Sequence, residues 1–135
     1  MAESNSATIK NIYAAFNRGD IEAVLAAVEL DAEWVNYGPA SVPYFGNFTG
    51  RMPDFFQAIG LSTTGGNVKI DRYLESGDSV VVEGRYTANV KATGALINAP
   101  IIHVFTLRNG KISSWRGYGD TAAVAAAHAG KAASA

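Results

Sequence analysis

The residues best suited to chemistry gather in one stretch, residues 100–120, PIIHVFTLRNGKISSWRGYGD. His103 stands there among apolar residues, and an imidazole in an apolar cavity can serve as general acid, general base or hydrogen-bond donor near neutral pH. Tyr118 adds a hydroxyl, and Asp120 adds a carboxylate that would orient or charge His103. This combination predicts acid–base catalysis, with a pH–rate profile that bends at about pH 6 to 7 and loses the bend in His103→Ala.

The same residues also have structural interpretations. His103 would then be a core histidine that is satisfied by one neighbour. Asp120 stands directly before Thr121-Ala-Ala and would cap the helix that follows, which is the preferred interpretation of this residue.

The stretch itself is predicted to be a β-hairpin. Apolar residues run up to Asn109-Gly110, alternation resumes after it, and Asn-Gly is the strongest short hairpin signal. Side chains alternate along a strand, so His103 shares its inward face with Leu107 and with Phe105, a further ligand-binding candidate. A long apolar hairpin with few polar groups is typical of one wall of a ligand pocket.

The second strand of the hairpin has an inward and an outward set. Strict alternation turns Trp115 and Gly117 toward the cavity. The residues of opposite phase then face a dimer partner or solvent: Arg116, Tyr118 and Asp120. A β-bulge near Gly117 or Gly119 would reverse this assignment.

Helices come first along the chain, and strands dominate its second half. Ile9, Ile12, Tyr13 and Phe16 recur at helical spacing, and Pro53 suits the first turn of a helix. The predicted helices cover residues 4–17, 21–29, 53–60 and 121 onward, with a frayed end; the predicted strands cover 31–36, 68–75, 79–90 and the two arms of the hairpin. This order predicts a single α+β domain over residues 1–135, in which helices cover one face of a curved antiparallel sheet.

A loop and a set of aromatic residues are expected to complete the pocket. Residues 37–50 hold two Pro and three Gly among four aromatics, which predicts a loop that covers a cavity. Asn36 would bind a ligand at the pocket mouth or else end its strand. About half of the following aromatic residues are expected to touch a ligand and the others to fill the core: Trp34, Tyr44, Phe45, Phe48, Phe55, Phe56 and Trp115.

Composition narrows the function. A net charge of −1 without a basic run disfavours a nucleic-acid partner. The chain has no Cys and two His, so we expect no metal site. No apolar run approaches the roughly 20 residues that span a bilayer, and the first residues lack a secretory pattern. We therefore expect a cytoplasmic protein without a membrane partner.

Three segments resemble a known family. AAFNRGDIEAVLAAVELDAEWV, PYFGNFTGR and HVFTLRNGKISSWRGYGDTAAVAAA are similar to SnoaL-like proteins of the nuclear transport factor 2-like superfamily, which also holds ketosteroid isomerase and scytalone dehydratase. The resemblance covers nearly the whole chain. It implies a cone: a strongly bent antiparallel sheet wrapped around three helices, with a deep pocket at the open end and a C-terminal helix. It also implies a homodimer packed through the outer sheet face.

The resemblance does not bring the ketosteroid isomerase chemistry over intact. That chemistry needs a carboxylate base and a two-donor oxyanion hole. The base position falls on Asn36, and the tyrosine donor falls on Ile12, with Tyr13 adjacent but about 100° round the helix. The protonated acid falls on His103, or on Ile102 if the hairpin turn has the same length as in the isomerase.

Other members of the superfamily also match only in part. SnoaL-type polyketide cyclases carry an acid on the last strand, which falls on Gly117 here, while Asp120 matches a carboxylate common nearby. Limonene epoxide hydrolase-like members need an Asp-Arg-Asp set; Glu83 and Arg85 are more simply an outward charge pair. His128, in the Ala-rich tail, is expected to be solvated.

Three functions remain open. The first is a cofactor-independent enzyme of the isomerase, cyclase or dehydratase kind acting on a hydrophobic carbonyl compound, with His103 as acid, base or oxyanion donor and Asp120 or Tyr118 assisting. The second is a non-catalytic binder of a hydrophobic small molecule, motivated by the missing acids at 36 and 117. The third is a dimeric interaction module, which predicts a filled pocket and an exposed apolar patch. A polar group in an aromatic pocket favours the first.

Overall fold

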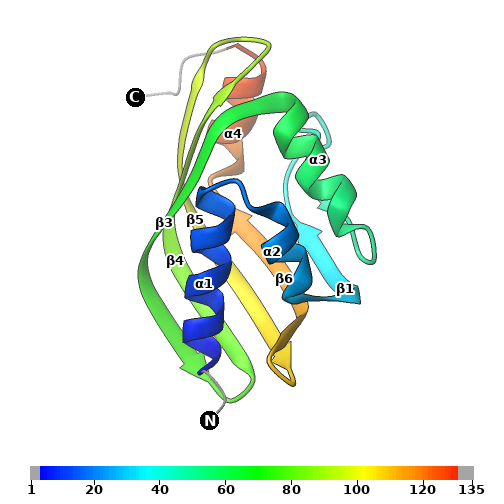
Figure 1. The fold of residues 1–135 in the computed structure, drawn as a ribbon. Coiled ribbons are helices and arrows are strands. Elements are labelled where there is room, and N and C mark those ends of the chain that lie inside the picture. Colours follow the sequence, from blue (N-terminus) through cyan, green and yellow to red (C-terminus); the bar gives the residue numbers. More distant parts are fainter. Residues whose placement is uncertain (1–3, 131–135) are drawn as a thin grey trace.

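The computed structural model describes residues 4–130, and the predicted end of the Ala-rich tail lies outside them. Within that range the chain forms four helices and six strands (Figure 1). Their bounds are α1 Asn5–Asn17, α2 Ile21–Ala26, β1 Val28–Asn36, β2 Gly46–Asn47, α3 Met52–Ser62, β3 Thr63–Ser76, β4 Ser79–Val90, β5 Leu96–Arg108, β6 Lys111–Gly119 and α4 Thr121–His128.

The helices begin where the sequence places capping residues. Ser4 accepts a hydrogen bond from the Ala7 amide at 3.1 Å at the start of α1, and Asp20 caps α2 in the same way. α2 is shorter than predicted, because residues from Val28 onward enter β1. α3 carries Pro53 in its first turn, where the missing N–H costs no helical hydrogen bond.

All strands belong to one sheet in the order β2-β1-β6-β5-β4-β3. Strands β3 to β6 form an antiparallel meander, and the predicted Asn109-Gly110 turn joins β5 to β6 with both residues at positive φ. β1, however, runs parallel to β6, which corrects the expectation of a wholly antiparallel sheet. The reason is that α3 carries the chain to the far edge, and the meander returns to β1 with β6 pointing in the same direction.

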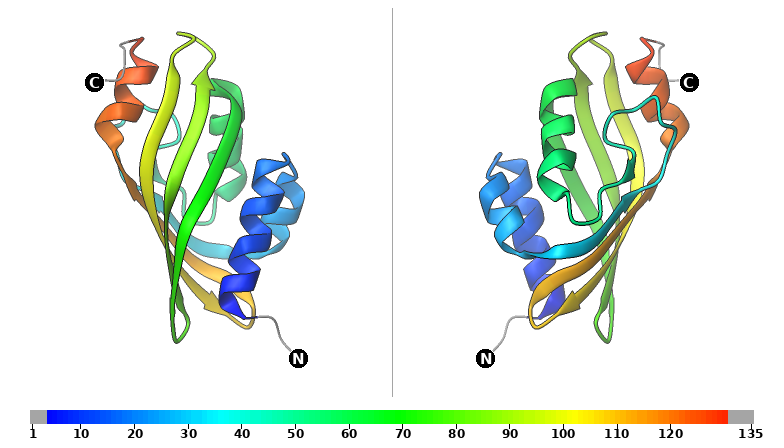
Figure 2. Two further views of the ribbon diagram at one scale, coloured as in Figure 1. Left: turned by 90° about the vertical axis from the view of Figure 1, so that its left-hand side faces the viewer. Right: turned by 90° about the vertical axis from the view of Figure 1, so that its right-hand side faces the viewer.

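The sheet bends strongly and wraps around α1, α2 and α3, which cover its inner face (Figures 1 and 2). Their apolar side chains meet those of the strands in one core, which contains Ile9, Val24 and Phe55. α4 lies near the end of the sheet where the loop between β1 and β2 also lies (Figure 2). The predicted α+β cone around three helices, with a C-terminal helix, is confirmed apart from the parallel pair.

The outer face of the sheet carries the charged side chains of β4. The sequence predicts an outward charge pair of Glu83 with Arg85, and this pair is not formed. Glu83 pairs instead with Arg72 of β3, and Arg85 donates to the Asn98 side-chain oxygen at 3.0 Å. Ile102 of β5 is exposed on this face. No helix in residues 4–130 has both the length and the apolar character that crossing a membrane requires.

Candidate functional site

A cavity of about 110 Å³ lies between the inner face of the sheet and the helices. Its walls are mostly aromatic and aliphatic side chains. The lining includes the exposed residues Tyr37, Tyr118 and Asp120, which mark the open end. It also includes the buried residues Tyr13 and Phe105, which mark the closed end. Residues from the first helix to the last therefore surround one cavity.

Strand pairing places four residues in one row across the inner face. Val82 pairs with His103, His103 with Gly117, and Gly117 with Asn36. The register of the hairpin shifts only further along, between residues 106 and 107, so alternation holds through this row. His103 lines the cavity, and so does Trp115, two residues before Gly117.

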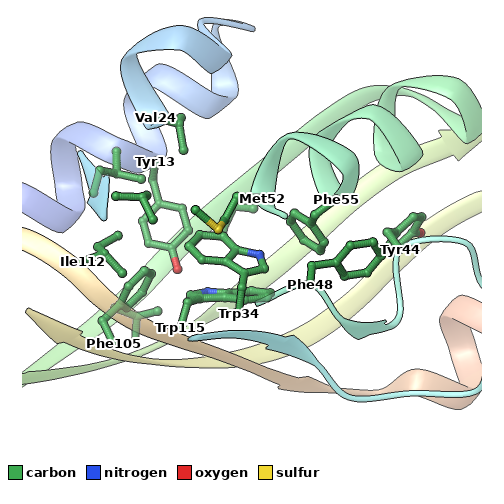
Figure 3. Close-up of a cluster of buried hydrophobic side chains, with 14 of the residues drawn as sticks. Tyr13, Val24, Trp34, Tyr44, Phe48, Met52, Phe55, Phe105, Ile112 and Trp115 are labelled. Atoms are coloured by element: carbon green, nitrogen blue, oxygen red, sulfur yellow. The ribbon is translucent and has the colours of Figure 1, made fainter. Parts of the chain in front are cut away.

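Tyr13 of α1 is the hydrogen-bond partner of His103. Its hydroxyl lies 2.6 Å from Nδ1 of His103, and the two rings stack with centroids 5.9 Å apart. Figure 3 shows the Tyr13 side chain reaching down from the helix toward the strands. The resemblance to ketosteroid isomerase places the tyrosine donor on Ile12, yet both Ile12 and Tyr13 line the cavity. The sequence feature that could have identified Tyr13 as a site residue is its hydroxyl group on the apolar face of a predicted helix.

The Tyr13–His103 pair is uncharged. Burial lowers the pKa of His103 from its ordinary 6.5 to about 3, because a charged imidazolium would lose its hydration there. Burial also raises the pKa of Tyr13 well above its ordinary value, so the phenol keeps its proton. This lowered pKa argues against the expectation that His103 titrates near neutral pH.

Stacked and edge-on aromatic rings form the wall beside this pair. Trp34 and Trp115 are register partners on β1 and β6, and their rings stack with centroids 4.7 Å apart (Figure 3). Phe48, a predicted ligand contact, is not part of the lining; it packs in the core against Phe55 with centroids 5.5 Å apart. The other predicted aromatic residues line the cavity: Trp34, Tyr44, Phe45, Phe55, Phe56, Phe105 and Trp115.

Asn36 and Gly117 lie side by side at the ends of β1 and β6. Asn36 Nδ2 donates to the Tyr44 carbonyl oxygen at 3.1 Å and so holds the loop that follows β1. A Cβ atom on Gly117 would lie 2.4 Å from Asn36 Oδ1 and 2.7 Å from the Trp115 ring. The two positions that match acids of the wider superfamily are thus neighbours, and neither carries an acid here.

Gly117→Ala is expected to destabilise the protein by about 1 to 3 kcal/mol, because Asn36 and Trp115 must move to admit the methyl group. The free energy of unfolding from urea titration measures the effect. Gly60→Ala is the matched control, since a Cβ at this helical position meets no atom within 4 Å, and it should be neutral or stabilising. Equal stability of the wild type and Gly117→Ala would contradict the close packing at this site.

Asp120 and Tyr118 lie at the open end of the cavity. Asp120 Oδ1 accepts a hydrogen bond at 3.1 Å from a first-turn amide of α4 and caps that helix. The hydrogen-bond partner of His103 is Tyr13, not Asp120. The Tyr118 ring stacks on Tyr37 with centroids 5.0 Å apart, which forms an aromatic rim at the mouth.

Two basic residues near the C-terminus differ in how well the sequence predicts them. Arg116 follows its strand phase outward, where its Nε donates to Glu33 Oε1 at 2.8 Å. The sequence predicts a solvated His128, but the structure corrects this: Nε2 of His128 lies 2.8 Å from the Tyr44 hydroxyl. Partial burial there lowers the pKa of His128. This contact connects α4 to the loop that covers the cavity.

The cavity offers hydrogen bonds and apolar contact rather than metal ligands. Within residues 4–130, no three His, Asp or Glu side chains come together in a metal-binding arrangement. Asp120 is the one charged side chain among the lining residues of that range, and it lies at the mouth. The arrangement can hold a hydrophobic molecule and donate a hydrogen bond to its oxygen at the Tyr13–His103 pair.

Solved structures share this architecture. An NTF2-like protein of unknown function from Burkholderia pseudomallei K96243 is 25% identical with a TM-score of 0.85, over 93% of this chain and 98% of its own. TerC, co-crystallised with polyporic acid, is 26% identical with a TM-score of 0.83, over 93% of this chain and 98% of its own. IdmH from Streptomyces antibioticus, a proposed polyketide cyclase, is 20% identical with a TM-score of 0.73, over 89% and 94%, and shows the shared fold alone.

Comparison with family models gives a direct assignment, although a search of curated proteins gives no match. The model of the SnoaL-like domain matches residues 9–115. This span runs from the buried face of α1, which carries Tyr13, to Trp115 in the cavity wall. The chain therefore belongs to the SnoaL-like domain family, within the NTF2-like superfamily.

Proposed function

We propose that this chain is a cofactor-independent enzyme of the isomerase, cyclase or dehydratase kind that acts on a hydrophobic carbonyl compound. The observation that carries the proposal is the hydrogen bond between Tyr13 and His103 at the closed end of an aromatic cavity. The neutral pair holds two protons, one of which lies in the shared hydrogen bond. Whichever group donates within the pair, one N–H or O–H remains for a ligand oxygen. Such a donor stabilises the negative charge that develops when a carbonyl compound loses an α-proton.

Asp120 is the residue we assign to proton transfer, with Tyr118 assisting. It contributes the one carboxylate to the lining among the described residues. Its Oδ1 caps α4, which leaves Oδ2 for a proton from the substrate at the mouth. Tyr118 lies beside it and presents a hydroxyl at the same end of the cavity. TerC, which is 26% identical, was co-crystallised with a small molecule, and this supports a small-molecule ligand for the present chain.

The test follows the methyl protons of acetophenone in D₂O by NMR. The wild type is expected to exchange them faster than buffer does. Tyr13→Phe removes one hydroxyl and should slow the protein-dependent exchange about 10²- to 10³-fold, the usual effect of losing an oxyanion donor. Tyr73→Phe removes a hydroxyl outside the cavity and should exchange at the wild-type rate. An unchanged rate in Tyr13→Phe would remove the Tyr13 hydroxyl from the mechanism, and an unchanged rate in the double variant of Tyr13→Phe with His103→Ala would remove the pair.

A non-catalytic binder is the second candidate function. The observation that favours it is the adjacent Asn36 and Gly117, which leave the inner row without a carboxylate base. In that case acetophenone should bind with an affinity that depends on Tyr13, while its exchange stays at the rate of buffer. The third hypothesis, a dimeric interaction module, predicts a filled pocket, and the presence of the cavity argues against it. A homodimer packed through the outer sheet face, where Ile102 is exposed, remains part of the proposal.

A further inference from the structure

The closed end of the cavity defines what kind of molecule it accepts. We propose that the ligand is an uncharged molecule built on one ring, whose oxygen binds at the Tyr13–His103 pair and whose substituent leaves through the mouth beside Asp120. This inference rests on the proposed function and deepens it by naming the substrate class. Three features carry it: the volume of the cavity, the position of its floor and the charges along its lining.

The volume matches a single ring. The cavity measures about 110 Å³. Pockets for drug-sized ligands usually measure about 300 to 1,000 Å³. An apolar protein cavity of about 150 Å³ takes up one benzene molecule. A fused ring system of three or four rings therefore exceeds the space that the closed end provides.

The floor of the cavity lies directly behind the Tyr13–His103 pair. The next inner row of the sheet consists of Val80, Phe105, Trp115 and Trp34, all of them at most 5% exposed. A ligand cannot pass this row without displacing the stacked tryptophans. Deep burial of these side chains and stacking of their rings fix the inner limit of the cavity.

On the β5–β6 side of the cavity, the distance from the Tyr13–His103 pair to the mouth is also short, whereas on the β3–β4 side the lining extends further, to Val68 and Tyr86. Ile101 and Gly119 pair at the open end, and His103 and Gly117 pair two residues further in. Two residues of an antiparallel strand span about 7 Å, which is close to the width of one six-membered ring. The aromatic side chains of the lining, among them the stacked Trp34 and Trp115, favour a flat ring in this space. Any further part of the ligand must extend past Tyr118 and Asp120.

The charges of the lining exclude an anion. Among the described residues no Lys or Arg lines the cavity, and the charged side chain at its mouth is the acid Asp120. The nearest strand cation, Arg116, is bound to Glu33 on the outer face. A carboxylate or phosphate on the ligand would therefore lose hydration without gaining a partner. An uncharged ligand meets no such cost.

A ladder of ketones with one to three rings tests the ring number by isothermal titration calorimetry on the wild-type protein. Acetophenone, 2-acetonaphthone and 2-acetylanthracene carry the same acetyl group on a growing ring system. Apolar area alone predicts tighter binding with each added ring. The cavity predicts the opposite order, with acetophenone at least about tenfold tighter than 2-acetylanthracene. Affinity that rises along the ladder would overturn the inference.

Two truncations test whether the cavity lining sets the limit on the number of rings in the ligand. Phe56→Ala removes a lining ring and should move the preference to 2-acetonaphthone. Phe48→Ala removes a ring that packs outside the cavity and should leave the order of the ladder unchanged. Circular dichroism confirms folding of each variant, and the ladder on the wild type decides the matter if either variant fails to fold.

A second pair of ligands tests the charge. Methyl 4-acetylbenzoate and 4-acetylbenzoate differ in the charge at the end that faces the mouth. The ester is expected to bind at least about tenfold more tightly, and Asp120→Asn should narrow this difference. Tighter binding of the carboxylate would overturn the inference. The proposed function fails separately: acetophenone would then bind with an affinity that Tyr13→Phe lowers, while its proton exchange stays at the rate of buffer.

Discussion

Asn36→Asp is expected to raise the rate of α-proton exchange in acetophenone by about 10²- to 10⁴-fold, the usual contribution of a positioned general base. The inner row of the sheet explains why. Asn36 and His103 stand on either side of Gly117, which has no side chain. With adjacent strands about 4.8 Å apart, their Cα atoms lie about 10 Å from each other. A ketone bound to the Tyr13–His103 pair is expected to turn its α-carbon toward residue 36, above the Trp115 ring that covers Gly117.

The surroundings of residue 36 would adapt a carboxylate to this task. The Asn36 amide donates to the Tyr44 carbonyl oxygen, and an aspartate would face that oxygen instead. A carbonyl oxygen and partial burial both disfavour the charged form, so the pKa of the new carboxyl should rise above its ordinary value. A base with a raised pKa removes protons more effectively near neutral pH. Loss of the hydrogen bond should lower stability by about 1 to 3 kcal/mol.

Two further variants separate the new base from a loosened loop. Asn36→Ala loses the same hydrogen bond to Tyr44 without gaining a carboxylate, so its exchange rate should stay at or below that of the wild type. The double variant of Asn36→Asp with Tyr13→Phe keeps the base but loses the oxyanion donor, so most of the gain should disappear. If Asn36→Asp binds acetophenone and exchanges it no faster than the wild type, the inner row does not bring residue 36 to the α-carbon.

The parts of this site that the sequence predicts depend on local patterns. Asn109-Gly110 defines the hairpin, and two-residue alternation from there places His103 and Trp115 on one face. The cap at Asp120 follows from a carboxylate directly before a helix. In each case the determining contacts lie within a few residues along the chain. The family resemblance supplied the rest of the cone.

The parts that the sequence does not predict depend on contacts between distant residues. Tyr13 meets His103 across 90 positions, and Tyr44 meets His128 across 84. The parallel pairing of β1 with β6 is likewise set by the path through α3. A helical wheel gives the angle between Ile12 and Tyr13 but not which of them faces a given strand. The pKa of His103 follows from the same packing, since burial lowers it.

The second large effect concerns acid. The folded protein is expected to lose about 2 kcal/mol of unfolding free energy between pH 7 and pH 5 through His103 alone. In the unfolded chain the imidazole binds a proton as the pH falls through 6.5, whereas a pKa of about 3 keeps it neutral in the folded protein. Below pH 6.5 the unfolded state then binds more protons than the folded state. The free energy of unfolding is therefore not reduced by His103 well above pH 6.5, and it declines as the pH falls below that value. The His103 ring lines the cavity and is only partly buried, so about 2 kcal/mol is an upper bound for this loss.

Urea unfolding between about pH 5 and pH 8 measures this loss. His103→Gln keeps a hydrogen-bonding group for Tyr13 but does not titrate, so its stability should fall by about 2 kcal/mol less than that of the wild type. Burial also lowers the pKa of His128, which acts in the same direction, and His128→Gln measures that share separately. Equal slopes for the wild type and His103→Gln would mean that the folded protein protonates His103. The pair beside Phe105 and Trp115 would then be a cation, and a neutral ketone would no longer be the ligand that it favours.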